Sequence, residues 1–292
     1  MTGFYAGGFE LKTRGYGRTG ESLLMIGAAL FLCGIALVGQ IYHLNARPPN
    51  AVLLWVAAIL PVAYLVRSAP VLFLGLAGTL IWIGWEFSTG DSLFYLGCGP
   101  APPFGDTYRC AAFGMQEIGV AIGAALTAAG VFHRGRPGGF QRVFESLGLL
   151  VTGACLYLLG FTRVLWKGHE SNTLGDLPLA PAILWALTAA ILIVASARHL
   201  PAEPPRPRRM MVAAALAAVV FSAAPPILGR LGYAGVDTLP TLTLLFWILL
   251  FAVSLVWISC GVRWQKPGWI SIGLFFIGLT IITRYFDVLG SR

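Results

Sequence analysis

The chain has 292 residues, of which 57% are hydrophobic and only 11% charged, and its mean hydropathy is +0.78. These values lie far outside the averages of soluble domains and predict an all-α, polytopic transmembrane helical bundle without a sizeable soluble domain. The formal net charge of +8 does not indicate nucleic-acid binding, because the Lys and Arg residues fall in short clusters between apolar runs, as in the loops of membrane proteins.

Residues 1–21 precede the first apolar run and are predicted to form a cytoplasmic N-terminal segment. They contain Lys12, Arg14 and Arg18, and they lack the apolar stretch of a secretory signal peptide. We therefore expect this segment not to be cleaved.

Nine apolar runs follow, each about long enough to cross the ~30 Å hydrocarbon core of a bilayer as a helix. They cover about 22–44, 51–67, 70–88, 113–132, 143–163, 180–197, 210–229, 239–261 and 267–285. Pro61 interrupts the second run, but a proline kink is tolerated within a helical bundle. We predict one transmembrane helical domain over residues 22–285 and a tail over 286–292.

The basic residues indicate how these spans are oriented. With the N-terminus inside, thirteen of the 20 Lys and Arg residues fall on the inner side and seven on the outer side. Because loops on the cytoplasmic side carry an excess of Lys and Arg, the N-terminus is predicted to be cytoplasmic and, with nine spans, the C-terminus to lie outside.

The longest outer loop, 89–112, contains Cys98 and Cys110 among several Pro and Gly residues. In an oxidising periplasm such a pair is a natural disulfide site, and we predict a disulfide between these two cysteines. Two unpaired or metal-ligating thiols are the alternative. Cys33, Cys155 and Cys260 lie in spans and are predicted to be buried apolar side chains.

A faint internal repeat accompanies the spans. Glu21-Ser22-Leu23 opens the first span, and Glu145-Ser146-Leu147 opens the fifth. Four spans return the chain to the same side of the membrane, so such units would be parallel four-helix pseudo-repeats. Chance similarity among helices rich in Leu, Gly and Ala would give the same pattern.

Polar and ionisable residues within or beside the spans gather on the outer side in this topology. They are Gln40, Tyr42, His43, Glu86, Glu117, Arg163, Arg284 and Asp287. A carboxylate in a bilayer needs a cation or a proton, so the two glutamates are expected to pair with an arginine or the histidine. Such a cluster would line an outward-opening pocket for a ligand. Alternatively, these groups only tie the helices together.

Sequence motifs of metal sites, phosphate loops and nucleophilic catalysis are not apparent. The histidine and the two glutamates of the polar set come from three separate spans, without the i, i+4 spacing of a local metal motif. We therefore predict neither a metal nor a cofactor. Gly119 and Gly123 form a Gly-x-x-x-Gly pair, which favours close approach of another helix.

Several segments resemble a known family. They are Tyr5 to Leu11, Gly20 to Leu24, Gly34 to Leu44, Leu53-Leu54-Trp55, Leu60-Pro61 and the late run Thr283-Arg284-Tyr285-Phe286-Asp287. They are similar to the bacterial multi-pass membrane family catalogued as domain of unknown function 2157. The resemblance implies an inner-membrane protein and supplies no activity. Compared with that family, the chain looks shortened at the N-terminus, and members of the family often continue further beyond the segment that corresponds to residues 284–287.

These observations lead to three functional hypotheses. The first is an outward-facing polar pocket that binds or moves a small molecule or a lipid headgroup. The second is a non-catalytic envelope scaffold or assembly partner, in which the polar residues lock helices together. The third is a membrane-embedded enzyme that acts at the outer leaflet, with Glu86 or Glu117 as its base beside His43. Membrane lipid is the one partner that the sequence implies.

Overall fold

The computed structural model describes residues 2–43, 47–88, 107–134, 139–161, 186–194, 205–223 and 239–290. Every regular element in these ranges is a helix, which confirms the predicted all-α class. By their internal contacts the helices fall into two compact units, which are treated separately below. The first comprises Met1–Phe94 and His133–Val143, and the second comprises Tyr95–Phe132 and Phe144–Arg292.

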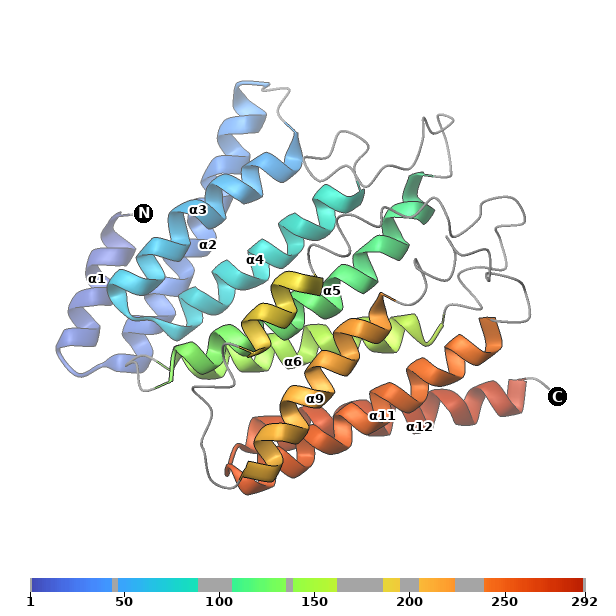
Figure 1. Cartoon of the computed structure of the whole chain (residues 1–292). Coiled ribbons are helices and arrows are strands. Elements are labelled where there is room, and N and C mark those ends of the chain that lie inside the picture. The colour runs from blue at the N-terminus through green and yellow to red at the C-terminus, as the bar shows by residue number, and fades with distance from the viewer. Residues whose placement is uncertain are drawn as a thin grey trace. The chain divides into compact units, whose positions relative to one another are not determined.

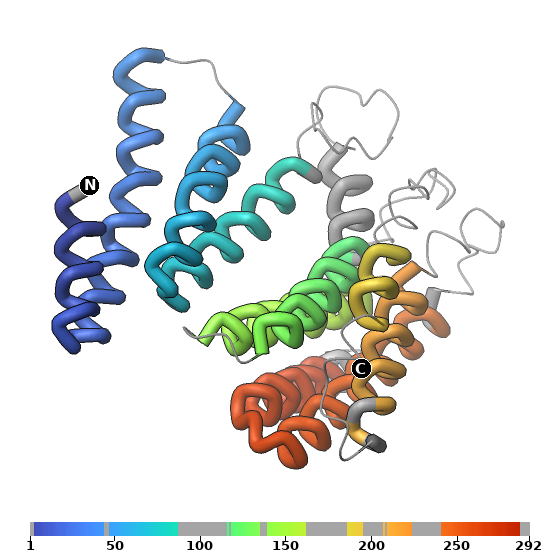
Figure 2. The backbone as a smooth tube through the Cα atoms, turned by 60° about the vertical axis from the view of Figure 1, so that its left-hand side comes forward, coloured from blue at the N-terminus to red at the C-terminus, as the bar shows by residue number. Residues whose placement is uncertain are grey.

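The first unit contains four helices: α1 (Thr2–Thr13), α2 (Gly17–Ile41), α3 (Pro48–Val66) and α4 (Ala69–Ser88) (Figure 1). The short helix α1 packs against α2, α2 contacts α3 and α4, and the last two pack against each other. Figure 2 shows α1 beside only the first half of α2. The sequence did not predict this helix.

Local chemistry sets the ends of these helices. Gly15 adopts a φ of 94° in the turn between α1 and α2, a conformation that other residues rarely take. Pro48 starts α3, where its fixed φ suits the first turn and its missing N–H costs no hydrogen bond. Arg67 ends α3 in a left-handed conformation. The predicted span began at residue 51 because prolines were treated as boundaries, whereas here they belong to the helix.

Trp55 anchors the core of the first unit. Its indole Nε1 donates a hydrogen bond of 2.8 Å to the carbonyl oxygen of Ala28, which joins α3 to α2. On the other side, Gly78 of α4 leaves room for the indole ring, since a Cβ there would meet Trp55 side-chain atoms. Leu24 and Ile59 are also fully buried in this unit, against Gly8 and Gly75 respectively.

The second unit contains α5 (Thr107–Phe132), most of α6 (Phe140–Leu159), a helix over 186–194, α9 (Pro205–Ser222), α11 (Leu239–Arg263) and α12 (Pro267–Gly290). Contacts join α11 to α12 and α9, and α9 also contacts α5. Large side chains fill the core, among them Leu156, Trp247, Leu250, Trp257 and Phe276.

Glycines bring α5 and α6 to backbone contact. A Cβ on Gly123 would lie 2.6 Å from the backbone N of Thr152 and 2.7 Å from the carbonyl oxygen of Gly148. A Cβ on Gly148 would likewise lie 2.5 Å from the backbone N of Thr127. The predicted close approach at the Gly119–Gly123 pair is therefore confirmed, with α6 as the partner helix.

Six of the described helices are long and apolar enough to cross a membrane: α2, α3, α4, α6, α11 and α12. Two shorter apolar helices cover Ile118–Phe132 and Arg209–Ser222. Many large apolar side chains remain exposed on the six, including Leu37, Leu65, Ile81 and Ile248. Helices that are apolar both toward the core and on their outer faces suit a lipid environment. The structure thus supports a membrane protein with several spans.

The cysteines divide into two groups. Cys98 lies outside the described residues, as does the side chain of Cys110, so the predicted disulfide stays a prediction. Cys260 is buried and its thiol donates to the carbonyl oxygen of Pro207 at 3.4 Å, as expected of a core cysteine. The prediction was wrong for Cys33, which is exposed on α2, because a mid-span position does not say which helix face is buried.

Candidate functional site

One end of the first unit carries a buried ion pair. Glu86, near the end of α4, has an exposed fraction of 0%, and its Oε2 lies 3.1 Å from Nη2 of Arg47. Arg47 is the N-cap residue of α3, and 31% of its side chain remains exposed. A buried carboxylate is costly unless a cation neutralises it. This pair meets that need and holds a guanidinium at the surface.

Three other predicted site residues lie at the same end of this unit. Gln40, Tyr42 and His43 close α2, directly before the short connection to α3. Tyr42 and His43 are exposed, and Gln40 is half-buried. His43 has a φ of 45°, so the chain turns sharply there.

The remaining predicted residues belong to the second unit or lie outside the described residues. Arg284 is exposed on α12, with its guanidinium carbon 5.8 Å from the ring centre of Trp247. Glu117 and Asp287 lie on α5 and α12 by their backbones, and their side chains are outside the described part, as is the whole of Arg163. Their joint pocket with the first unit therefore stays a prediction.

Sequence reasoning missed Arg47 as a partner for Glu86. The expected cations were Arg163, Arg284 or His43, because Arg47 was assigned only to a loop. A usable signal existed in the topology: α2 ends, α3 begins and α4 ends on the same side, which places Arg47 and Glu86 at one level. Membrane burial of Glu86 then favours the nearest cation at that level.

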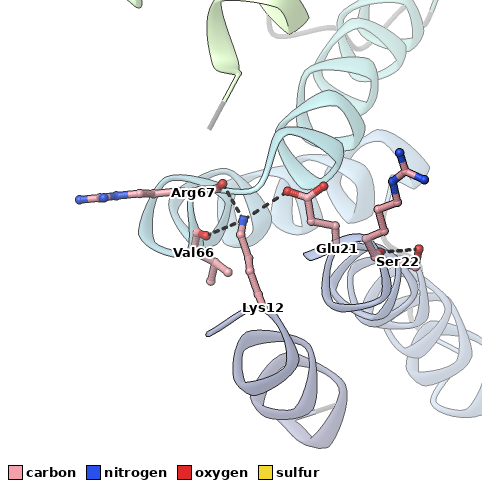
Figure 3. Close-up of polar contacts among 6 residues, drawn as sticks. Lys12, Glu21, Ser22, Val66 and Arg67 are labelled. Carbon is pink, nitrogen blue, oxygen red and sulfur yellow. Dashed lines mark hydrogen bonds and ion pairs between the residues drawn. The ribbon is translucent and has the colours of Figure 1, made fainter. Parts of the chain in front are cut away.

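A lysine joins three helices at the opposite end of the first unit (Figure 3). Lys12, near the end of α1, donates to Oε1 of Glu21 at 3.3 Å and to the carbonyl oxygens of Val66 and Arg67 at 3.3 and 2.9 Å. An ammonium has three donors, and here it has three acceptors. A cation also suits the C-terminal carbonyls of α3, where the helix dipole is negative.

A second buried carboxylate lies in the other unit. Glu145 of α6 is almost fully buried, and Nζ of Lys266 lies 2.6 and 2.8 Å from its two oxygens. The indole Nε1 of Trp269 donates to the same carboxylate at 2.9 Å. The Lys266 ammonium also lies 4.9 Å from the ring centre of Trp269. Glu145 was noted only as part of a repeat, and its role in an ion pair was not predicted.

Residues 1–72 match the model of a family described as "Predicted membrane protein (DUF2157)". The matched part covers α1, α2 and α3, and thus the whole Lys12 contact set, and it bears out the family resemblance noted for the early segments. The late run 283–287 lies beyond the matched residues. Neither a curated protein nor a solved structure matches the chain.

Proposed function

We propose that this multi-pass membrane protein lies in a bacterial inner membrane, crosses it nine times with its N-terminus cytoplasmic, and binds or moves a small molecule or lipid headgroup at an outward-facing polar site. The observation that supports this is the Arg47–Glu86 pair, a cation held at the end of a span by a fully buried carboxylate. The match of residues 1–72 to a predicted membrane protein family supports the location in a membrane and names no ligand.

The chemistry of the pair favours an anionic ligand group. A guanidinium presents a planar fork of N–H donors that fits the two oxygens of a carboxylate or phosphate. Glu86 fixes one of the guanidinium nitrogens at 3.1 Å, which orients the group before a ligand arrives. The hydroxyl of Tyr42, the amide of Gln40 and the imidazole of His43 end α2 on the same side and supply further polar groups.

Native mass spectrometry of the gently purified protein tests this proposal. We expect a co-purifying mass on the wild-type protein that is lost in both Arg47→Ala and Glu86→Ala. The first substitution removes the cation, and the second removes the carboxylate that orients it. Arg14→Ala is the matched control: Arg14 is an exposed cation paired with Glu10 at the other end of the unit, and the bound mass should persist. Arg284→Ala tests whether the second unit contributes.

The mass spectra distinguish a ligand site from a protein without a ligand. A mass lost in the Arg47 and Glu86 variants, which still elute as folded protein, supports a ligand site and identifies the ligand class. A bare wild-type protein, or a mass that survives in both variants, contradicts the proposal.

A scaffold is the second candidate, and the ion pairs favour it. Three salt bridges of the described residues join separate elements: Lys12–Glu21 joins α1 to α2, Arg47–Glu86 joins the start of α3 to α4, and Lys266–Glu145 joins the α11–α12 turn to α6. Polar contacts of this kind stabilise helix packing without a ligand. The scaffold predicts a bare wild-type protein and variants that are only less stable.

The parallel pseudo-repeats are also part of the proposal. Glu21 and Glu145, from the two Glu-Ser-Leu openings, each pair with a lysine: Lys12 near the end of α1 in one unit, and Lys266 in the turn between α11 and α12 in the other. The shared ion pair supports a common origin of the two openings.

The predicted Cys98–Cys110 disulfide provides a test of orientation. If the loop 89–112 faces an oxidising periplasm, alkylation of the denatured protein should modify three of the 5 cysteines before reduction and all of them afterwards. Cys98→Ser should then leave Cys110 reactive without reduction. Five reactive thiols in protein isolated under acid quench would contradict both the disulfide and the assignment of this loop to the periplasm.

A further inference from the structure

We propose that α1 is a half-membrane helix, which runs back into the bilayer beside α2 and presents Phe4 and Phe9 to the acyl chains of one leaflet. The inference concerns residues 3–9 and holds whichever side of the membrane they enter from. It does not depend on the proposed ligand site.

The length of α3 fixes the level of the membrane surface. This helix has 19 residues, so it is about 28 Å long at ~1.5 Å per residue. The hydrocarbon core is ~30 Å thick, so α3 has no length to spare if it crosses the membrane. Its last residue, Val66, and the C-cap residue Arg67 therefore lie at one edge of the hydrocarbon core.

Lys12 lies at this same level, because its ammonium contacts the carbonyl oxygens of both residues. Glu21 of α2 joins it there and marks where the uncharged part of α2 begins. The plane through Lys12 and Glu21 is thus the polar boundary of two spans.

From that plane α1 runs along α2 toward the centre of the membrane. A Cβ on Gly20 would meet the backbone of Gly8 and Lys12. About two turns further along α2, a Cβ on Gly27 would meet the Cβ of Phe4 at 3.1 Å. The two helices are therefore antiparallel and in close contact over this stretch. Phe4 is eight residues from Lys12, which places it about 12 Å inside the polar boundary.

The chemistry of α1 agrees with this depth. Residues 3–9 read Gly-Phe-Tyr-Ala-Gly-Gly-Phe without a charge, and the charged residues of the hairpin begin at Glu10. Glu10 pairs with Arg14, whose long side chain can reach the headgroups. Phe4 lies with its Cβ against Gly27 of α2, yet 38% of the residue is exposed, and Phe9 is 50% exposed, so both aromatic rings present apolar surface outside the hairpin. A helix in water would carry polar side chains at these exposed positions, whereas the acyl chains of lipids can cover the two aromatic rings.

This inference changes one expectation from the sequence. The segment 1–21 was assigned to the cytoplasm because it precedes the first apolar run, contains Lys12, Arg14 and Arg18, and lacks an apolar stretch of its own. The contacts of Gly8 and Gly20 instead support an uncharged half of that segment in the bilayer, with Glu10 to Glu21 at its surface.

Photocrosslinking in native membranes tests the proposal. The variants Phe4→p-benzoylphenylalanine and Phe9→p-benzoylphenylalanine replace one exposed aromatic side chain by another that inserts into nearby C–H bonds on irradiation. We expect phospholipid adducts on both, at several-fold higher yield than on Tyr16→p-benzoylphenylalanine, since Tyr16 is exposed in the turn beyond the polar boundary. Because Phe4 also contacts α2, adducts to the protein itself are expected there, and Phe9 decides the test: protein adducts in place of lipid adducts at Phe9, or lipid yields at both positions no higher than at Tyr16, would overturn the proposal.

A second measurement does not need the photoreactive side chain. Ala6→Cys and Thr13→Cys both lie at exposed positions of α1 and are compared with the parent chain in open membrane fragments. A polar, membrane-impermeant maleimide should modify Thr13→Cys and leave Ala6→Cys unmodified until detergent is added. Equal modification of the two in intact membranes would show that water reaches residue 6 and would refute a half-membrane helix.

Discussion

Lys266→Ala is expected to destabilise the folded protein by about 3 kcal/mol, because it leaves the Glu145 carboxylate buried without its cation. Removing one partner of a buried ion pair costs roughly 3–5 kcal/mol, and the lower end applies since 27% of the lysine side chain is exposed. Trp269 would still donate its N–H to the carboxylate, but one neutral donor does not replace an ammonium. Titration of the purified protein in mixed micelles with a denaturing detergent unfolds it and measures the loss of unfolding free energy.

The control is the exposed pair on α1. Arg14 and Glu10 form an i, i+4 salt bridge with more than half of each side chain exposed, so Arg14→Ala should cost at most about 1 kcal/mol. The double variant Glu145→Leu/Lys266→Met removes both charges from the site and should recover much of the stability lost by Lys266→Ala. The prediction fails if Lys266→Ala unfolds at the same denaturant level as Arg14→Ala.

Gly123→Ala is expected to lower stability by about 1–3 kcal/mol, although alanine normally favours a helix over glycine by ~1 kcal/mol. The added Cβ would meet the backbone N of Thr152 and the carbonyl oxygen of Gly148 at 2.6 and 2.7 Å. Backbone atoms cannot rotate away, so α5 and α6 would have to separate. The separation would loosen the side-chain packing along the rest of this helix pair.

A glycine with free space around it provides the comparison. Gly278 of α12 has no atom within 4 Å of a built Cβ, so Gly278→Ala should be neutral or slightly stabilising in the same unfolding measurement. Gly148→Ala should resemble Gly123→Ala, because the contact is reciprocal. Equal stability of the Gly123 and Gly278 variants would show that the α5–α6 contact is looser than the structure indicates.

The sequence predicted the long helices well because a bilayer span leaves a strong trace. Twenty apolar residues without charge have few other structural solutions. The helix α1 left no such trace: three of its twelve residues are glycine, which has a low helix propensity. Its contact with α2 stabilises it, and that contact depends on Gly8 and Gly20 being opposite each other in space. Nothing in a linear pattern shows that pairing.

The polar residues were easier to find than to pair. Glu86 was identified because a carboxylate near the end of an apolar run is unusual. Its cation, Arg47, lies 39 residues earlier and was hidden among ordinary loop charges. Lys266 pairs with a glutamate 121 residues away, and no spacing rule connects the two. Which charges meet is decided by the packing of helices, and a single sequence holds that information only indirectly.

The contacts of Lys12 also set an order of events during synthesis. Its two carbonyl acceptors lie 54 and 55 residues further along the chain. A ribosome that adds about 5–20 residues per second needs several seconds to cover that distance. The α1–α2 hairpin is therefore made, and meets the membrane, before the end of α3 that completes its polar anchor exists. Throughout that interval, the glycine contact between the two helices and the single ion pair with Glu21 are the only parts of this anchor that the nascent chain can form.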